Sequence, residues 1–143
     1  MRSSLIVASL FILMFAFGCG KQDAGPVVIP TSAGRGDSGR AILSVIPRHN
    51  GMNVDTATVY IKYNALNAPV NGYDDSMVCT LNAGNPLAKF DSLRNGNYYL
   101  YCTGHIIDTT GGLNKYVPLS GGTGYTVITQ STTPVTILLP VNQ

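Results

Sequence analysis

Residues 57–64 read ATVYIKYN, and apolar and polar side chains alternate along them without interruption. In a β-strand, successive side chains point to opposite faces of the sheet, so this stretch assigns Ala57, Val59 and Ile61 to one buried face. The intervening Thr58 and Tyr60 then face outward. The alternation predicts a half-buried strand, and therefore a fold built from sheets.

Six further apolar runs surround this strand, separated by turns rich in glycine, asparagine and proline. Glutamate is absent and threonine, glycine and tyrosine are frequent, a composition that favours strands over helices. The glycine run at residues 121–124 is expected to form a hairpin or bulge. We predict an all-β fold, a single seven-stranded β-sandwich over residues 40–143, with strands near residues 41–45, 57–64, 77–81, 87–90, 98–107, 125–128 and 135–139.

The stretch AKFDSLRNGNYYL at residues 88–100 resembles the A-x-F-x-x-L-x-x-G-x-Y-x-L signature of the transthyretin-like superfamily, whose members include carboxypeptidase regulatory-like domains. Residues 57–61 are similar to the strand that precedes this signature. The resemblance implies an Ig-like, transthyretin-like sandwich with Phe90, Leu93, Tyr98 and Leu100 in its core. It implies little about function, because such modules serve as spacers, pilus subunits and ligand binders alike.

The start of the chain predicts export and lipidation. Arg2 is followed by an apolar run at residues 5–17 that contains one polar residue, Ser9. The run is shorter than the roughly 20 residues needed to span a bilayer. The sequence AFGC at residues 16–19 resembles the bacterial lipobox, which implies cleavage before Cys19 and a diacylglycerol thioether on its sulfur. We therefore expect a lipoprotein signal peptide at residues 1–18. An ordinary secretory signal is the alternative.

Residues 19–39 are expected to form a lipid-anchored flexible linker, because Pro26, Pro30 and several glycines interrupt any periodic pattern. Gly20 follows Cys19 where an aspartate would resemble an inner-membrane retention signal, so an outer-membrane lipoprotein is expected. The sequence KQD at residues 21–23 is similar to the charged export signal of surface lipoproteins in the Bacteroidota. The periplasmic side and the cell surface both remain open.

The mature chain is expected to be nearly neutral and without catalytic chemistry. Removing residues 1–18 takes Arg2 from nine lysines and arginines and leaves eight, against seven aspartates. No basic cluster could neutralise a phosphate backbone, so no nucleic-acid partner is expected. His49 and His105 lack the spacing of metal ligands, and Asp74-Asp75 is expected to solvate a loop. We predict no enzyme activity, metal or cofactor.

Two short motifs in the linker are expected to be coincidences. The tripeptide RGD at residues 35–37 is the one read by animal integrins, and GDSG at residues 36–39 copies the serine motif of chymotrypsin-like proteases. That protease class places its histidine before the serine, whereas the first histidine here is His49. Neither motif therefore predicts a function.

Cys79 and Cys102 remain once Cys19 is lipidated, and alternation places both on apolar strand faces. Export to an oxidising compartment favours a disulfide between them. Closing a loop of about 22 residues would stabilise the fold by about 3 kcal/mol in the chain-entropy picture. The alternative is a pair of buried free thiols, since cysteine is itself a common core residue.

Three tyrosines are expected on the outer face of the sheet. If Val59 and Leu100 face inward, then Tyr60, Tyr99 and Tyr101 face outward. Aromatic rings on a flat sheet can stack on the apolar faces of sugars, so these residues are the candidate ligand face. The alternative is that they pair across strands and shield the sheet.

These observations predict a membrane-anchored envelope lipoprotein that acts as a non-enzymatic structural or ligand-binding accessory. Its partners would be the membrane, through the N-terminal lipid, and an envelope protein or glycan. The alternative is a fimbrial or adhesin-type subunit of the cell surface, because some pilus proteins of the Bacteroidota resemble lipidated transthyretin-like sandwiches. Filaments visible by negative-stain microscopy would distinguish the two.

Overall fold

A computed structural model describes residues 32–54 and 56–143 of the chain. The expected signal peptide at residues 1–18, the lipidation site Cys19 and the linker up to residue 31 lie outside the described residues. Within the described part the secondary structure is all-β, and no helix there is long and apolar enough to cross a membrane. The strands are β1 (Ala41–His49), β2 (Met52–Asn53), β3 (Thr56–Tyr63), β4 (Asp75–Val78), β5 (Thr80–Asn82), β6 (Asn85–Leu93), β7 (Gly96–Asp108), β8 (Lys115–Val127) and β9 (Val135–Pro140).

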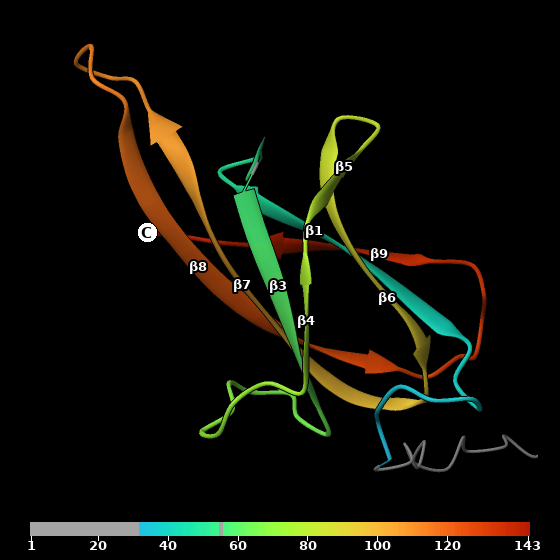
Figure 1. Cartoon of the computed structure of the whole chain (residues 1–143). Coiled ribbons are helices and arrows are strands. Elements are labelled where there is room, and N and C mark those ends of the chain that lie inside the picture. The colour runs from blue at the N-terminus through green and yellow to red at the C-terminus, as the bar shows by residue number, and fades with distance from the viewer. Residues whose placement is uncertain (1–31, 55) are drawn as a thin grey trace, which may run out of the picture.

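These strands form two sheets (Figure 1). One has the order β2-β1-β6-β5, with β9 pairing along β1, and the other has the order β4-β3-β7-β8. All pairs are antiparallel except β1 with β9, which is parallel. The all-β prediction is therefore confirmed, and the arrangement is compatible with a sandwich.

One apolar core draws on both sheets. The alternation at residues 57–63 is confirmed, because Val59 and Ile61 are fully buried while Thr58 and Tyr60 are only half-buried. Burying apolar surface contributes about 25 cal/mol per Å², which makes this core the main source of stability. Its largest fully buried side chains include Leu43, Val45, Phe90 and Leu139 from one sheet and Val59, Ile61, Tyr98 and Leu100 from the other.

The strand prediction was wrong in three places. The expected strand at residues 77–81 is split, because the chain leaves one sheet after Val78 and enters the other at Thr80. The two-residue β2 was not predicted. The glycine run at residues 121–124 forms neither a hairpin nor a bulge but lies inside β8, which pairs continuously with β7 from Gly96↔Val127 to Asp108↔Lys115. The count is thus nine strands in the described residues, not seven.

Residues 33–36, assigned above to the flexible linker, pack against the domain. Ala33 N donates a hydrogen bond to Asn64 Oδ1 (2.9 Å), and Gly36 N donates to Ser92 O (3.0 Å). Ala33 is also a member of the buried core. The packed domain therefore includes Ala33, seven residues before Arg40.

Tyr98 ties this entering segment to the core. Its hydroxyl donates to Arg94 O, four residues earlier (2.6 Å), and accepts a hydrogen bond from Gly34 N (3.0 Å). A tyrosine near the start of a strand whose hydroxyl bonds to the backbone a few residues upstream has the same local geometry as a tyrosine corner. Here the corner joins β6 of one sheet to β7 of the other.

The β7–β8 hairpin extends beyond the rest of its sheet and is called the arm below. The ladder of β3 on β7 ends at Thr56↔His105, whereas β8 accompanies β7 to Asp108↔Lys115. Figure 1 shows the tip of the arm at one end of the molecule and the segment at residue 32 at the opposite end. The arm exposes Ile107, Leu113 and Tyr116, and the Tyr116 ring meets the His105 ring edge-on at 5.0 Å.

Candidate functional site

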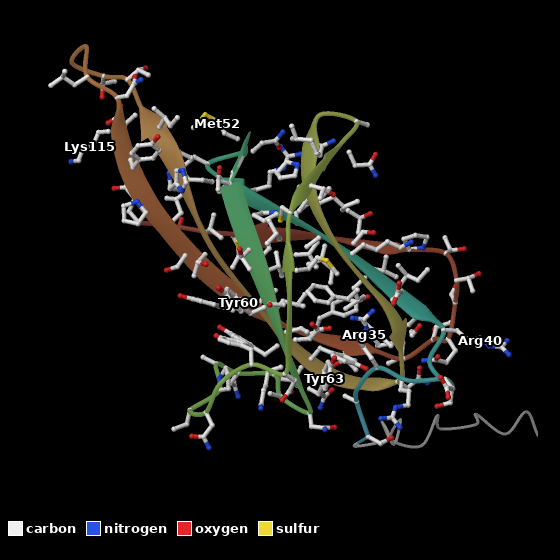
Figure 2. All side chains as sticks on the ribbon, viewed as in Figure 1. Arg35, Arg40, Met52, Tyr60, Tyr63 and Lys115 are labelled. Carbon is white, nitrogen blue, oxygen red and sulfur yellow. The ribbon has the colours of Figure 1, made fainter. Side chains whose placement is uncertain are left out.

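The outer face of the β4-β3-β7-β8 sheet carries the three tyrosines singled out above. Tyr60 on β3 is the direct cross-strand partner of Tyr101 on β7, and their ring centroids are 6.3 Å apart. Both alternate with fully buried residues, so their rings lie on the face turned away from the core. Tyr60 is labelled in Figure 2. Adjacent strands thus bring two of the three predicted residues together.

A fourth tyrosine, Tyr73, completes this group. It comes from the loop between β3 and β4, and its ring stacks on Tyr101 at 5.5 Å with an interplanar angle of 8°. Its centroid is also 5.4 Å from that of Tyr60, with the planes tilted by 40°. We call Tyr60, Tyr73 and Tyr101 the tyrosine cluster.

The loop that carries Tyr73 crosses the outer face of the sheet as far as β8. The backbone of Leu66 lies so close to Gly124 that a Cβ at position 124 would overlap it. The absence of a side chain at this position therefore lets the loop reach the sheet. Stacking at Tyr73 and this close approach at Leu66 together fix the loop at two points.

Tyr99 does not join the tyrosine cluster. Its ring lies across Gly122 on β8, where a Cβ would overlap its hydroxyl. Tyr99 is thus packed over the neighbouring strand, which is the arrangement expected of a residue that shields the sheet. The glycines of β8 make room for this ring and for the loop.

A shallow depression beside the tyrosine cluster is lined by Tyr60, Tyr73, Asp74, Asp75 and Ser76. Asp75 is the cross-strand partner of the buried Ile61, so its carboxylate lies on the opposite side of β4 from the Tyr60 ring. Asp74 Oδ1 accepts a hydrogen bond from Lys62 Nζ (2.9 Å), and Asp74 Oδ2 accepts one from Tyr63 N (2.7 Å). Asp75 Oδ2 pairs with Arg35 Nη1 (2.7 Å). Both carboxylates are therefore held in place by cations of the chain itself.

Arg35 links the entering segment to two strands. Its second guanidinium nitrogen pairs with Asp91 on β6 (2.6 Å), and the hydrogen bonds to Asp75 and then Asp91 raise its pKa above the ordinary value. These contacts engage the arginine of the RGD tripeptide. In this structure its guanidinium is therefore a bridge between β4 and β6.

The ionisation of this site follows from its contacts. Burial acts to raise the pKa of Asp74, but the hydrogen bonds from Lys62 and from the Tyr63 N–H outweigh it and hold that pKa below its ordinary value. Burial, followed by the neighbouring Tyr99 and Tyr101, raises the pKa of Tyr73. At neutral pH the depression therefore combines an ionised Asp74 with an uncharged Tyr73.

The histidines lie away from this depression. His49 is buried, with Nδ1 at 2.9 Å from Val141 O and Nε2 at 3.1 Å from Asn50 Nδ2. His105 packs against Tyr116 on the arm. Among the residues described, no group of three or more His, Cys, Asp or Glu side chains could hold a metal ion.

The chain was compared with protein-family models, with curated proteins and with solved structures, and none of them matches it. The assignment of a function therefore depends on the residues and on the geometry given above.

Sequence reasoning missed Tyr73 and Arg35. Tyr73 lies in an irregular loop, so no alternation marks it, although its position after the Asn71-Gly72 turn and before Asp74-Asp75 could have drawn attention. Arg35 was placed in the linker on composition alone. Only long-range contacts reveal where these two side chains lie.

Cys79 and Cys102 are both free thiols in this structure. Cys102 is opposite Val59 on one side of β3, whereas Cys79 N bonds to Ala57 O on the other side (2.9 Å). The two cysteines therefore lie on backbone segments with β3 between them, and such segments are about 9.5 Å apart. A disulfide spans at most about 7 Å between Cα atoms. A bridge would require the backbone to move, so the disulfide stays a prediction.

We expect both thiols to react slowly with iodoacetamide in the native chain at neutral pH and fully after unfolding. The thiolate is the nucleophile, and burial raises the pKa of Cys79 to about 11 and that of Cys102 to about 12. Peptide mass spectrometry of labelled, unreduced protein separates these sites from Cys19. Recovery of a peptide that joins Cys79 to Cys102 would instead establish the disulfide.

Proposed function

We propose that this chain is a lipoprotein of the bacterial envelope that acts as a non-enzymatic structural or ligand-binding accessory. Residues 1–18 would be removed as a signal peptide, and Cys19 would carry the lipid. The support for the anchor is the short apolar run at residues 5–17 and the lipobox-like AFGC at residues 16–19. Two or three acyl chains suffice to hold a small domain at a membrane.

The proposal places the domain among Ig-like, transthyretin-like sandwiches. Phe90, Leu93, Tyr98 and Leu100, which the resemblance places in the core, are each 0% exposed. The tyrosine-corner geometry at Tyr98 supports the same assignment, since Ig-like sandwiches use this device where the chain passes between sheets. Fold alone leaves the function open, because such modules have many roles.

The observation that carries the ligand-binding role is the depression beside the tyrosine cluster. It places ring faces next to the Asp74 carboxylate, whose position is fixed by Lys62. Carboxylates held in ion pairs are poor general acids or bases at neutral pH, whereas they remain good hydrogen-bond acceptors. The depression is therefore better suited to binding than to catalysis.

The position of the entering segment is compatible with a tether. Residues 33–36 are bound at the end of the domain opposite the tip of the arm (Figure 1). A lipid attached at Cys19 would thus hold the domain by one end. The arm and the outer sheet face would stay accessible to partners in the envelope.

Membrane fractionation of a Gram-negative host expressing the full chain tests the proposal. We expect the protein in the outer-membrane fraction, and protease treatment of intact cells would distinguish the surface from the periplasmic side. Negative-stain microscopy of the same membranes should show no filaments. Recovery of the chain in the soluble fraction would contradict the anchor, and filaments would favour a fimbrial subunit.

A further inference from the structure

The depression beside Tyr60 and Tyr73 presents its hydrogen-bonding groups in fixed positions. Each oxygen of Asp74 accepts one bond from the chain, from Lys62 or from the Tyr63 N–H. A carboxylate oxygen can accept two bonds, so one acceptor site stays open on each. The Asp74 side chain is 31% exposed, which leaves those sites within reach of a ligand.

The charges around the depression nearly cancel. Lys62 and Asp74 neutralise each other on the side of the tyrosines. On the opposite side of β4, Arg35 pairs with Asp75 and Asp91, so the five groups together carry a net charge of −1. A net charge this small gives little attraction for a cation at physiological ionic strength, where exposed charges are screened within about 8 Å. An anionic ligand would be repelled by the Asp74 carboxylate. The electrostatics therefore favour an uncharged ligand rich in hydrogen-bond donors.

The two rings of the depression are also fixed in place. Tyr73 rests in parallel on Tyr101, which supports it from the sheet side, and Tyr60 is tilted by 40° toward it. The contact of Leu66 with Gly124 holds the other end of the loop. Binding to groups that are already ordered avoids much of the entropic cost of association.

We propose that this depression binds a neutral glycan, with the apolar face of a sugar ring on Tyr60 and Tyr73 and its hydroxyls donating to Asp74. The inference rests on the ligand-binding role proposed above and specifies its ligand. It replaces the sequence-based choice of Tyr99 by Tyr73, because Tyr99 is packed over Gly122. Tyr101 acts beneath Tyr73 as a positioning residue.

The test uses the full chain in detergent micelles. It is screened on an array of neutral cello-, xylo- and N-acetylchito-oligosaccharides, and the best binder is then titrated by calorimetry. We expect Tyr73→Ala and Tyr60→Ala each to weaken binding by about tenfold or more, because each removes a stacking ring. Tyr73→Phe keeps the ring and should bind nearly as well as the wild type. Tyr116→Ala, which removes an exposed tyrosine of the arm, is the matched control and should change nothing.

Circular dichroism first establishes that each variant is folded, and Tyr60→Ala serves if Tyr73→Ala does not fold. Failure of the wild-type chain to bind any neutral glycan of the array overturns the proposal, as does unchanged binding by folded Tyr60→Ala and Tyr73→Ala. Salt-sensitive binding of the cationic glycan chitosan alone would overturn the ligand class. A chain that fractionates with the outer membrane but binds no glycan loses only this inference, whereas a soluble chain that binds glycans loses only the anchor.

Discussion

Replacing Phe90 by alanine is expected to lower the free energy of unfolding by about 3 to 5 kcal/mol. The Phe90 side chain lies on β6, is 0% exposed and belongs to the core between the two sheets. Alanine would leave a cavity that the paired strands around it cannot close, since β6 is fixed to β1 at Leu43↔Phe90. A loss of this size is a large part of the 5 to 15 kcal/mol typical of a small domain.

Urea unfolding followed by circular dichroism measures the effect. Lys89→Ala is the matched control, because Lys89 is the preceding residue on the same strand and its side chain is exposed. The Lys89→Ala midpoint should stay close to that of the wild type. Equal tolerance of both changes would contradict the register that places Phe90 inside.

The parts of the fold that could be predicted are those with one buried face. Along β3, Ala57, Val59 and Ile61 alternate with polar residues because successive side chains of a strand point to opposite faces of the sheet. The alternation therefore specifies both the strand and its register. Phe90 on β6 and Tyr98 on β7 were expected in the core from the resemblance to the transthyretin-like signature. Both side chains are fully buried.

The passage of the chain between sheets could not be predicted from periodicity. Met77, Cys79 and Leu81 continue the alternation as if on one strand, yet the backbone changes sheets at Cys79. The local sequence pattern shows which residues are apolar, but it does not show which strand the segment pairs with. The partner is decided by tertiary contacts, here the bond of Cys79 N to Ala57 O.

The length of β8 was missed for a related reason. Pro118 and the glycines at positions 121, 122 and 124 are poor strand formers. Pairing with the whole of β7 overrides that weak preference. The glycines are compatible with the strand because other groups occupy the space where side chains would be: the backbone at Pro140 beside Gly121, the Tyr99 ring beside Gly122 and the Leu66 backbone beside Gly124.

The candidate site was predicted in part. Alternation placed Tyr60 and Tyr101 on the outer face, where the structure pairs them. Tyr73 and Arg35 come from segments without regular structure. The Tyr73–Tyr101 contact spans 28 residues of sequence, and the Arg35–Asp75 contact spans 40. Such contacts follow from the folded arrangement and leave no periodic trace in the sequence.

We propose that Cys19 carries a lipid, and removal of this cysteine is expected to have the largest effect on where the protein resides. Each buried methylene contributes about 0.8 kcal/mol to membrane binding, so loss of the acyl chains should abolish stable anchoring of the mature domain. Cys79→Ser is the control, because it removes a thiol that lies in the described domain and is not expected to be lipidated.

The most direct measurement is incorporation of radiolabelled palmitate into the full chain in a Gram-negative host. The wild type and Cys79→Ser should be labelled, and Cys19→Ser should carry no label and migrate differently on a gel because its signal peptide is not removed in the usual way. Labelling of Cys19→Ser at the wild-type level, or absence of label from the wild type, would contradict the assignment of this chain as a lipid-anchored envelope protein.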